Sequence, residues 1–310
     1  MYKYIARRLL SIIPILLLTI FIVFVILEST PGDPAMIILG RDASPDALNA
    51  LREELGFNKP MLLRYLDYVQ GIFTRFDFGE SYRSKQPVFD NILVQFPTTL
   101  KLAIFSVIVA SIVGIPLGIV SAVRQYSLTD VALTVSALFL ASIPGFWLSL
   151  LLVLFFSLLL GVLPSTGIDS WKNYILPVAT LALPSAAILM RITRAQMMEV
   201  WKQDYIRTAR AKGANEWRVI TKHAIKNALM PVITIVGMSF AGLLGGTVIV
   251  ELIFGMPGLG NLIISAIKLK DIPIVMAGTI FLSTLFMLIM LLVDLLYAFI
   301  DPRTKSQFKR

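Results

Sequence analysis

The sequence contains no cysteine and a single histidine, His223, among its 310 residues. Without cysteine the chain forms no disulfide, holds no thiolate-bound metal and uses no cysteine nucleophile. One histidine in a strongly basic stretch offers neither a cluster of imidazole ligands for a metal nor the Ser/His pair of a hydrolase. The sequence also lacks the Gly-x-x-x-x-Gly-Lys-Ser/Thr loop, so we expect no ATP bound by this chain in the usual way.

Charge is scarce as well. Only 15% of the residues are charged, whereas 57% are hydrophobic, and the mean hydropathy is +0.80. This composition excludes a soluble domain and indicates a polytopic membrane protein in contact with membrane lipids. The formal net charge of +9 would suggest a nucleic-acid partner in a soluble chain. Here the basic excess lies near the ends of apolar runs, where it biases loops towards the cytoplasm, so we predict no nucleic acid.

Six apolar runs are long enough to cross a bilayer. The basic stretch 191–231 joins two of them, and both chain ends are basic, so we predict that both termini are cytoplasmic. The first run follows three basic residues but lacks a small-residue cleavage site, which indicates a retained anchor. The predicted spans are 9–27, 98–122, 131–160, 174–193, 229–250 and 274–299. The predicted divisions are the N-terminal end with the first span (1–27), an external cap (28–97), a five-span core (98–303) and a cytoplasmic tail (304–310).

The stretch 191–231 holds nine Lys and Arg residues against three acidic ones. We expect a helix from Met197 to Lys212 that ends at a left-handed Gly213. Asn215 then caps a second helix from Glu216 to Ala228. That helix carries an apolar face of Trp217, Ile220, Ala224 and Ala228 and a basic face of Arg218, Lys222 and Lys226. Two interpretations remain open on these residues: an interfacial helix on anionic headgroups, or a docking helix for a cytoplasmic partner.

The external segment 28–97 has ten acidic residues against seven basic ones, which fits the outer side of the membrane. We predict a helix over Pro45–Leu55 with Ser44 as its N-cap and Gly56 after its end. A second, amphipathic helix is predicted over Met61–Phe73. The segment is either a structural cap over span ends or a receiving surface for a partner outside the membrane.

Small and kinking residues interrupt the spans. Ser106, Ala110, Gly114 and Gly118 recur every four residues, a stripe that favours close helix packing, although a stripe facing a lumen would look the same. We place the start of the second span at Pro97 and a kink in the third at Pro144-Gly145. Asp294 lies near the inner end of the sixth span, where a structural partner is favoured over a proton relay. Candidates for a pathway or gate are Ser142, Pro144, Gly145, Gly242, Gly245 and Gly246.

Five motifs occur between Pro31 and Arg303. They are Pro31-Gly32-Asp33-Pro34, Asp77-Phe78-Gly79-Glu80-Ser81, DYIRTARAKG from Asp204 to Gly213, ELIFGMPGLG from Glu251 to Gly260, and VDLLYAFIDPR from Val293 to Arg303. In this order they resemble the permeases of dipeptide and oligopeptide ABC importers, in the peptide, nickel and opine branch, and specifically the B-type subunit. The general importer signature is Glu-Ala-Ala, three residues, then Gly. Here Arg207 occupies the position of the Glu. This chain therefore lacks the carboxylate of the generic contact with the ATPase.

The resemblance implies an all-α permease of the type I ABC importer fold, with six transmembrane helices. It implies a second, homologous permease as a heterodimer partner, two cytoplasmic ATPase subunits that bind ATP and Mg²⁺, and an extracytoplasmic substrate-binding protein. This chain itself would hold no cofactor, no metal and no catalytic residue. The implied ATPase-coupling residues are Asp204, Tyr205, Ile206, Arg207, Thr208, Ala209, Arg210, Ala211, Lys212 and Gly213. Implied contacts for the binding protein are Asp77, Phe78, Gly79, Glu251, Pro257 and Gly258.

The same resemblance implies uptake of di- or oligopeptides by alternating access. The alternatives within the branch are nickel chelates, opines and glutathione. An ion-coupled secondary transporter is a rival class, but it requires ionisable residues at mid-membrane positions, and only Asp294 comes near one. A membrane-embedded enzyme would need paired acids or a Ser/His pair, which the spans do not offer.

Overall fold

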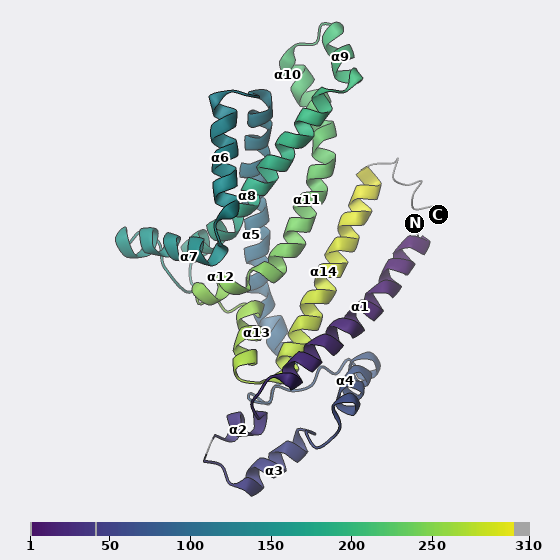
Figure 1. Cartoon of the computed structure of the whole chain (residues 1–310), viewed down its shortest axis with the longest axis vertical. Coiled ribbons are helices and arrows are strands. Elements are labelled where there is room, and N and C mark those ends of the chain that lie inside the picture. The colour runs from purple at the N-terminus through teal and green to yellow at the C-terminus, as the bar shows by residue number, and fades with distance from the viewer. Residues whose placement is uncertain (1, 41, 301–310) are drawn as a thin grey trace. The chain divides into compact units, whose positions relative to one another are not determined.

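The computed structural model describes residues 2–40 and 42–300, and the elements of this part of the chain are all helices. It divides into two compact units. The cap unit comprises Tyr2–Thr99 and Pro257–Met287, and the core unit comprises Leu100–Met256 with the described residues from Leu288 onwards. The elements are α1 (Tyr2–Ser29), α2 (Pro34–Leu39), α3 (Pro45–Glu54), α4 (Met61–Arg75), α5 (Val88–Val123), α6 (Leu128–Ser142), α7 (Gly145–Leu152), η1 (Val153–Leu159), α8 (Lys172–Trp201), α9 (Asp204–Ala211), α10 (Glu216–Arg218), η2 (Val219–Ala224), α11 (Ile225–Gly246), α12 (Val248–Ile253), α13 (Leu259–Lys268) and α14 (Ile272–Ile300). Here η1 and η2 are π-helical (Figure 1).

Five helices in the described chain are long and apolar enough to cross a membrane, and a sixth crossing results if one bent pair counts as a single span. All five overlap spans predicted from the sequence, so the helical membrane class is confirmed. Each has at least the ~20 residues that a crossing requires. The five are Ile5–Ser29, Val88–Val123, Trp171–Trp201, Glu216–Gly246 and Ile272–Leu296.

The third predicted span, 131–160, is not one continuous helix but a pair of helices with a sharp bend between them. Helix α6 ends at Ser142, and the α7–η1 segment leaves it at 101°, so that α7 runs across the direction of α6 (Figure 1). The break itself falls where the sequence placed it. Proline at 144 donates no backbone hydrogen bond and favours an extended preceding residue, and Ile143 has ψ 125°.

Three predicted helix boundaries also need correction. Helix α5 begins at Val88, so Pro97 lies inside the helix rather than in its first turn. The helix predicted over Met197–Lys212 is divided, because α8 continues to Trp201 and α9 starts afresh at Asp204. The helix predicted over Glu216–Ala228 does not end there but continues into α11 as one apolar run.

Close packing in the core unit centres on α8, which α5, α6 and α11 contact. The small-residue stripe of α5 faces it. A Cβ added at Gly114 would lie 2.5 Å from the carbonyl oxygen of Ala186, and one at Gly118 would lie 2.5 Å from that of Met190. The packing interpretation of this stripe is therefore confirmed, since only glycine lets the two backbones approach this closely.

The cap unit has its own apolar core, in which Phe24 of α1, Ile72 of α4 and Val275 of α14 belong to one buried cluster. The predicted cap helices are confirmed. Ser44 accepts a hydrogen bond from the backbone N–H of Ala47 at the start of α3, and Gly56 follows the helix with φ +74°.

Candidate functional site

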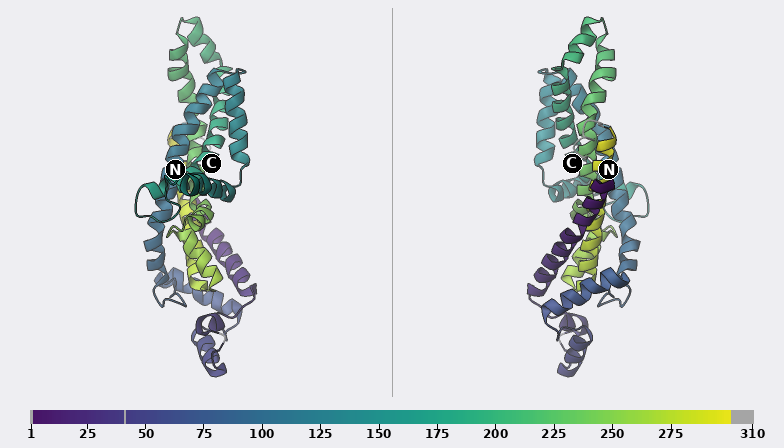
Figure 2. Two further views of the ribbon diagram at one scale, coloured as in Figure 1. Left: turned by 90° about the vertical axis from the view of Figure 1, so that its left-hand side faces the viewer. Right: turned by 90° about the vertical axis from the view of Figure 1, so that its right-hand side faces the viewer.

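Helix α9 lies at the end of α8 and α11, beyond the other helices of the core unit, in both side views (Figure 2). Its local signals act as predicted. Gly213 has φ +80°, a left-handed conformation that favours glycine, and its N–H donates to the carbonyl of Arg210. The side chain of Asn215 accepts from the backbone N–H of Arg218 at 2.9 Å and caps the next helix. The chain therefore reverses direction within four residues after α9.

One face of α9 is anchored in an apolar cluster. Ile206 and Ala209 are buried there together with Met197 of α8 and Ala224 of η2. This cluster covers most of the apolar face that the sequence predicted for the segment after Gly213. Trp217 departs from that prediction, because its side chain is 74% exposed. It follows Asn215 by two residues and lies before the covered part of the face begins.

The other face of α9 is exposed and borders a cavity of about 530 Å³. Three cations, Lys212, Arg218 and Lys222, line this cavity, and His223 lies among them. We define this as the basic groove. No acidic side chain lines it in the described chain, so its charge favours an acidic partner surface. The exposed residues of α9 and its C-cap are Asp204, Tyr205, Arg207, Thr208, Arg210, Ala211 and Lys212.

An ion pair connects α9 to α10 across Gly213. The guanidinium of Arg210 donates to both carboxylate oxygens of Glu216, at 2.8 and 3.1 Å. This hydrogen bonding raises the pKa of Arg210 above its ordinary value. Because the two side chains are 43% and 62% exposed, the pair contributes little to the free energy of unfolding. Its bidentate geometry does fix how α9 is held against α10.

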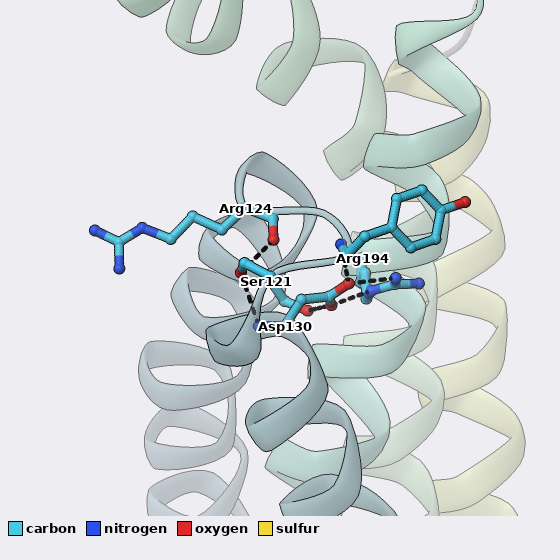
Figure 3. Close-up of polar contacts among 6 residues, drawn as sticks. Ser121, Arg124, Asp130 and Arg194 are labelled. Atoms are coloured by element: carbon cyan, nitrogen blue, oxygen red, sulfur yellow. Dashed lines mark hydrogen bonds and ion pairs between the residues drawn. The ribbon is translucent and has the colours of Figure 1, made fainter.

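A second polar cluster joins the α5–α6 hairpin to α8 (Figure 3). The carboxylate of Asp130 accepts from Arg194 Nε at 2.7 Å and from a terminal guanidinium nitrogen at 2.8 Å. It also accepts from Ser121 Oγ at 2.5 Å and from the backbone N–H of Tyr126 at 2.9 Å. Asp130 is almost fully buried, and four donors satisfy it.

Sequence reasoning missed this cluster as a unit. In the sequence, Asp130 is simply an acid that precedes an apolar run, and Arg194 is one of the nine basic residues of 191–231. One local signal was present, because Ser127 caps α6 three residues before Asp130. The partner of Asp130, 64 residues further on, left no such signal.

The pathway candidates all lie in the core unit. Ser142, Pro144 and Gly145 are exposed at the 101° bend, where Ser142 Oγ donates back to the carbonyl of Leu138. The remaining three candidates are exposed on α11, and an added Cβ would meet nothing within 4 Å in the described chain. These are Gly242, Gly245 and Gly246. In contrast, Gly237 of the same helix packs directly against Val293.

The candidate contacts for a binding protein fall in both units. Asp77 is exposed in the cap unit and accepts from the N–H of Gly79, whereas Phe78 is half-buried. Pro257 is exposed and Gly258 is buried. Glu251 is fully buried, so its side chain presents no surface and we withdraw it as a contact residue. It lies inside α12, which continues to Ile253, three residues beyond the predicted end of the fifth span at residue 250.

Two buried polar residues next to the start of α14 form hydrogen bonds that join separate segments of the cap unit. Sequence reasoning did not single them out. Asp271 accepts from Ser81 Oγ at 2.5 Å and from the backbone N–H of Tyr82 at 3.1 Å. The ammonium of Lys270 donates to the carbonyl of Thr30. Within the described residues no group of three or more His, Cys, Asp or Glu is arranged to hold a metal.

Two family models together match most of the chain. The model described as binding-protein-dependent transport system inner membrane component matches residues 114–306. Its N-terminal counterpart matches residues 1–103. The chain belongs to this family and is the multi-pass inner-membrane permease of an ABC importer.

Curated relatives agree over nearly the full length. The glutathione transport system permease protein GsiC of Escherichia coli K12 is 41% identical over 302 residues, which is 97% of this chain and 98% of the relative. GsiC of Pectobacterium atrosepticum is 42% identical over 305 residues, with the same coverage.

Solved structures support the fold alone. The MetNI methionine ABC transporter, in an inward-facing conformation, is similar with a TM-score of 0.57 and 18% identity, over 69% of this chain and 98% of that one. An amino acid ABC transporter crystallised with histidines gives 0.52 and 19%, over 69% and 94%.

Proposed function

We propose that this permease takes up short peptides, with glutathione as the first candidate, delivered by an extracytoplasmic binding protein. The observation that carries the substrate class is the 41% identity to a glutathione permease over 97% of the chain. Glutathione is itself a tripeptide, so this relative lies within the class that the sequence motifs imply. The relatives named above are glutathione permeases, which favours glutathione over the alternative cargoes of the branch, nickel chelates and opines.

Energy comes from two partner ATPases that bind ATP and Mg²⁺, and one of them docks on α9. Support for this docking site comes from its construction. One face of α9 is buried, the other is exposed, and the left-handed Gly213 and the Arg210–Glu216 pair hold the turn that follows. A helix held in this way transmits displacement to α8 and α11, because Ile206 and Ala209 pack into the cluster that both neighbours share.

The interfacial-helix alternative is less well supported. An amphipathic helix on headgroups inserts its apolar face into the membrane. In α9 Ile206 and Ala209 are already buried against α8, η2 and α11. Apart from Tyr205 and Ala211, the exposed side chains of α9 are polar, which suits a protein surface.

A second, homologous permease pairs with this chain as a heterodimer and completes the pathway. The glycines at 242, 245 and 246 support this arrangement, because they leave part of α11 without a packing partner in the described chain. No residue of the described chain lies within 4 Å of a Cβ added at any of them. Both termini lie in the cytoplasm, as the basic residues of the ends and of 191–231 favour. Exposed Ser142, Pro144 and Gly145 remain our candidates for a gate.

Uptake by cells tests the cargo. A strain that lacks this permease is expected to accumulate no radiolabelled glutathione, and the wild-type gene restores uptake. An excess of unlabelled dipeptide then reports the breadth of the class through competition. Restored uptake of a dipeptide but not of glutathione would overturn glutathione as the cargo and leave a peptide permease. Restored uptake of neither would refute the substrate class.

A further inference from the structure

Helix α4 of the cap unit has two apolar faces, and only one of them is covered in the described chain. The covered face contacts α1 and contributes Ile72 to the buried cluster of the cap unit. The other face carries Leu62, Leu66 and Phe73, whose positions fall within about 40° of one another around the helix axis. These three side chains are 50–60% exposed. A row of large apolar side chains left open in this way marks an interaction surface.

Beside this apolar stripe the exposed surface of α4 becomes polar. Asp67, Gln70 and Thr74 are exposed there, and Leu63 lies among them. Around the helix axis the order is therefore a packed face, an apolar stripe and a mainly polar edge. This order is typical of a helix at a membrane interface, which inserts its apolar side chains and keeps its polar side chains in water.

The covered face of α4 is attached to a membrane span at a definite depth. The ring of Tyr65 packs edge-on against Phe21 and Phe24, with centroids 5.4 and 6.0 Å away, and its hydroxyl donates to the carbonyl of Leu17. Leu17 is the central residue of the candidate span Ile5–Ser29. The two phenylalanines lie roughly 8–12 Å along α1 from its end at Ser29, close to the ~5–10 Å to which interfacial helices are buried.

Phe76, directly after α4, adds to the exposed apolar surface. Its side chain is 82% exposed, and its backbone is left-handed with φ +54°, a conformation that bulky residues rarely adopt. Its ring meets the edge of the Phe78 ring, which stacks on Phe89. A bulky residue kept in a disfavoured conformation with its ring exposed indicates a use for that ring outside the fold.

We propose that α4 lies in the lipid interface at the end of α1, with Leu62, Leu66, Phe73 and Phe76 inserted among headgroups and acyl chains. A lipid surface fits better than a protein partner, because Tyr65 holds the helix beside a span at the depth of the leaflet, where a soluble protein does not reach. The predicted topology places this leaflet on the outer side of the membrane. The helix anchors the cap unit to the membrane, whatever cargo the importer carries.

Single spin labels test this placement, because the chain contains no cysteine of its own. A nitroxide is attached to Leu66→Cys or Phe73→Cys in the complete importer in lipid bilayers, and the wild-type assembly gives the background from the other subunits. Electron paramagnetic resonance then compares collisions with oxygen, which concentrates in lipid, and with a water-soluble nickel complex. We expect oxygen to reach both labels more often than the nickel complex does.

Gln70→Cys and Thr74→Cys are the matched controls, since they lie on the polar edge of the same helix. We expect the preference to reverse at these two positions. Uptake by each variant reports that it has assembled, and Leu62→Cys provides a further position on the apolar stripe if one variant fails. Equal access of the nickel complex to the stripe and to the polar edge would overturn the proposal. Protection of the stripe only after the binding protein is added would also overturn it and assign the surface to that protein.

Discussion

Arg194 of α8 donates two hydrogen bonds to the carboxylate of Asp130, which lies in the first turn of α6. The carboxylate takes two further bonds from the α5 end and the α5–α6 turn. A single buried acid thus joins three helices of the core unit. Since α8 leads directly into α9, this cluster ties the hairpin to the base of the segment that carries α9.

Removing the charge of Asp130 leaves Arg194 without its partner. We expect Asp130→Asn to destabilise the protein by about 2–3 kcal/mol, somewhat below the cost for a fully buried pair, because Arg194 is 27% exposed. Thermal unfolding in detergent measures the change. Glu54→Gln breaks an exposed pair and should shift the melting temperature far less. Equal shifts in the two variants would contradict the buried-pair interpretation.

Two glycines in different environments test the packing of the spans. A Cβ at Gly118 collides with the backbone oxygen of Met190, so we expect Gly118→Ala to cost about 1–3 kcal/mol through forced backbone shifts. Gly242→Ala meets nothing in the described chain and should leave the melting temperature of the isolated chain unchanged or raised. If residue 242 faces the second permease or the pathway, uptake still falls. Unaltered uptake would remove Gly242 from the candidates.

Substitutions of Gly213 test the turn after α9 through the backbone conformation alone, because an added Cβ meets no atom within 4 Å. An L-residue in this conformation costs roughly 1–2 kcal/mol, whereas asparagine tolerates it better. We therefore expect Gly213→Val to lose the stimulation of ATP hydrolysis by the binding protein and Gly213→Asn to keep most of it. The purified assembly provides the assay, and full stimulation in the valine variant would refute a role for this turn in coupling.

The basic groove predicts a salt-sensitive contact. Reversing one of its charges, as in Lys222→Glu, should lower the amount of ATPase that co-purifies and make its release occur at lower salt. Lys226→Glu makes the same change on the same segment but outside the groove, and it is the matched control. An identical loss in both variants would point to net charge rather than to the groove.

Local features of the segment from α9 to α10 were predictable, because their signals lie within a few residues. The φ of Gly213 and the cap at Asn215 are of this kind. The end of α8 at Trp201 was not, since neither proline nor glycine occurs there and packing sets the boundary.

Contacts between residues that are far apart in the sequence were not predictable, for a different reason. Residues 130 and 194 form their pair only when α6 and α8 pack side by side. The break at Pro144 was predictable from proline chemistry, but its 101° angle depends on the helices that surround it. The burial of Glu251 likewise depends on α12 extending beyond residue 250, where the predicted fifth span ends.

Transport in reconstituted vesicles tests the central claim most directly. The complete assembly, with its binding protein, is placed in proteoliposomes that contain either ATP or an ion gradient. We predict accumulation of unmodified glutathione with ATP alone, and loss of this accumulation in Gly213→Val. Accumulation driven by the gradient without ATP would contradict the account. Transport would then need no ATPase docked on α9, and the chain would act as a secondary transporter.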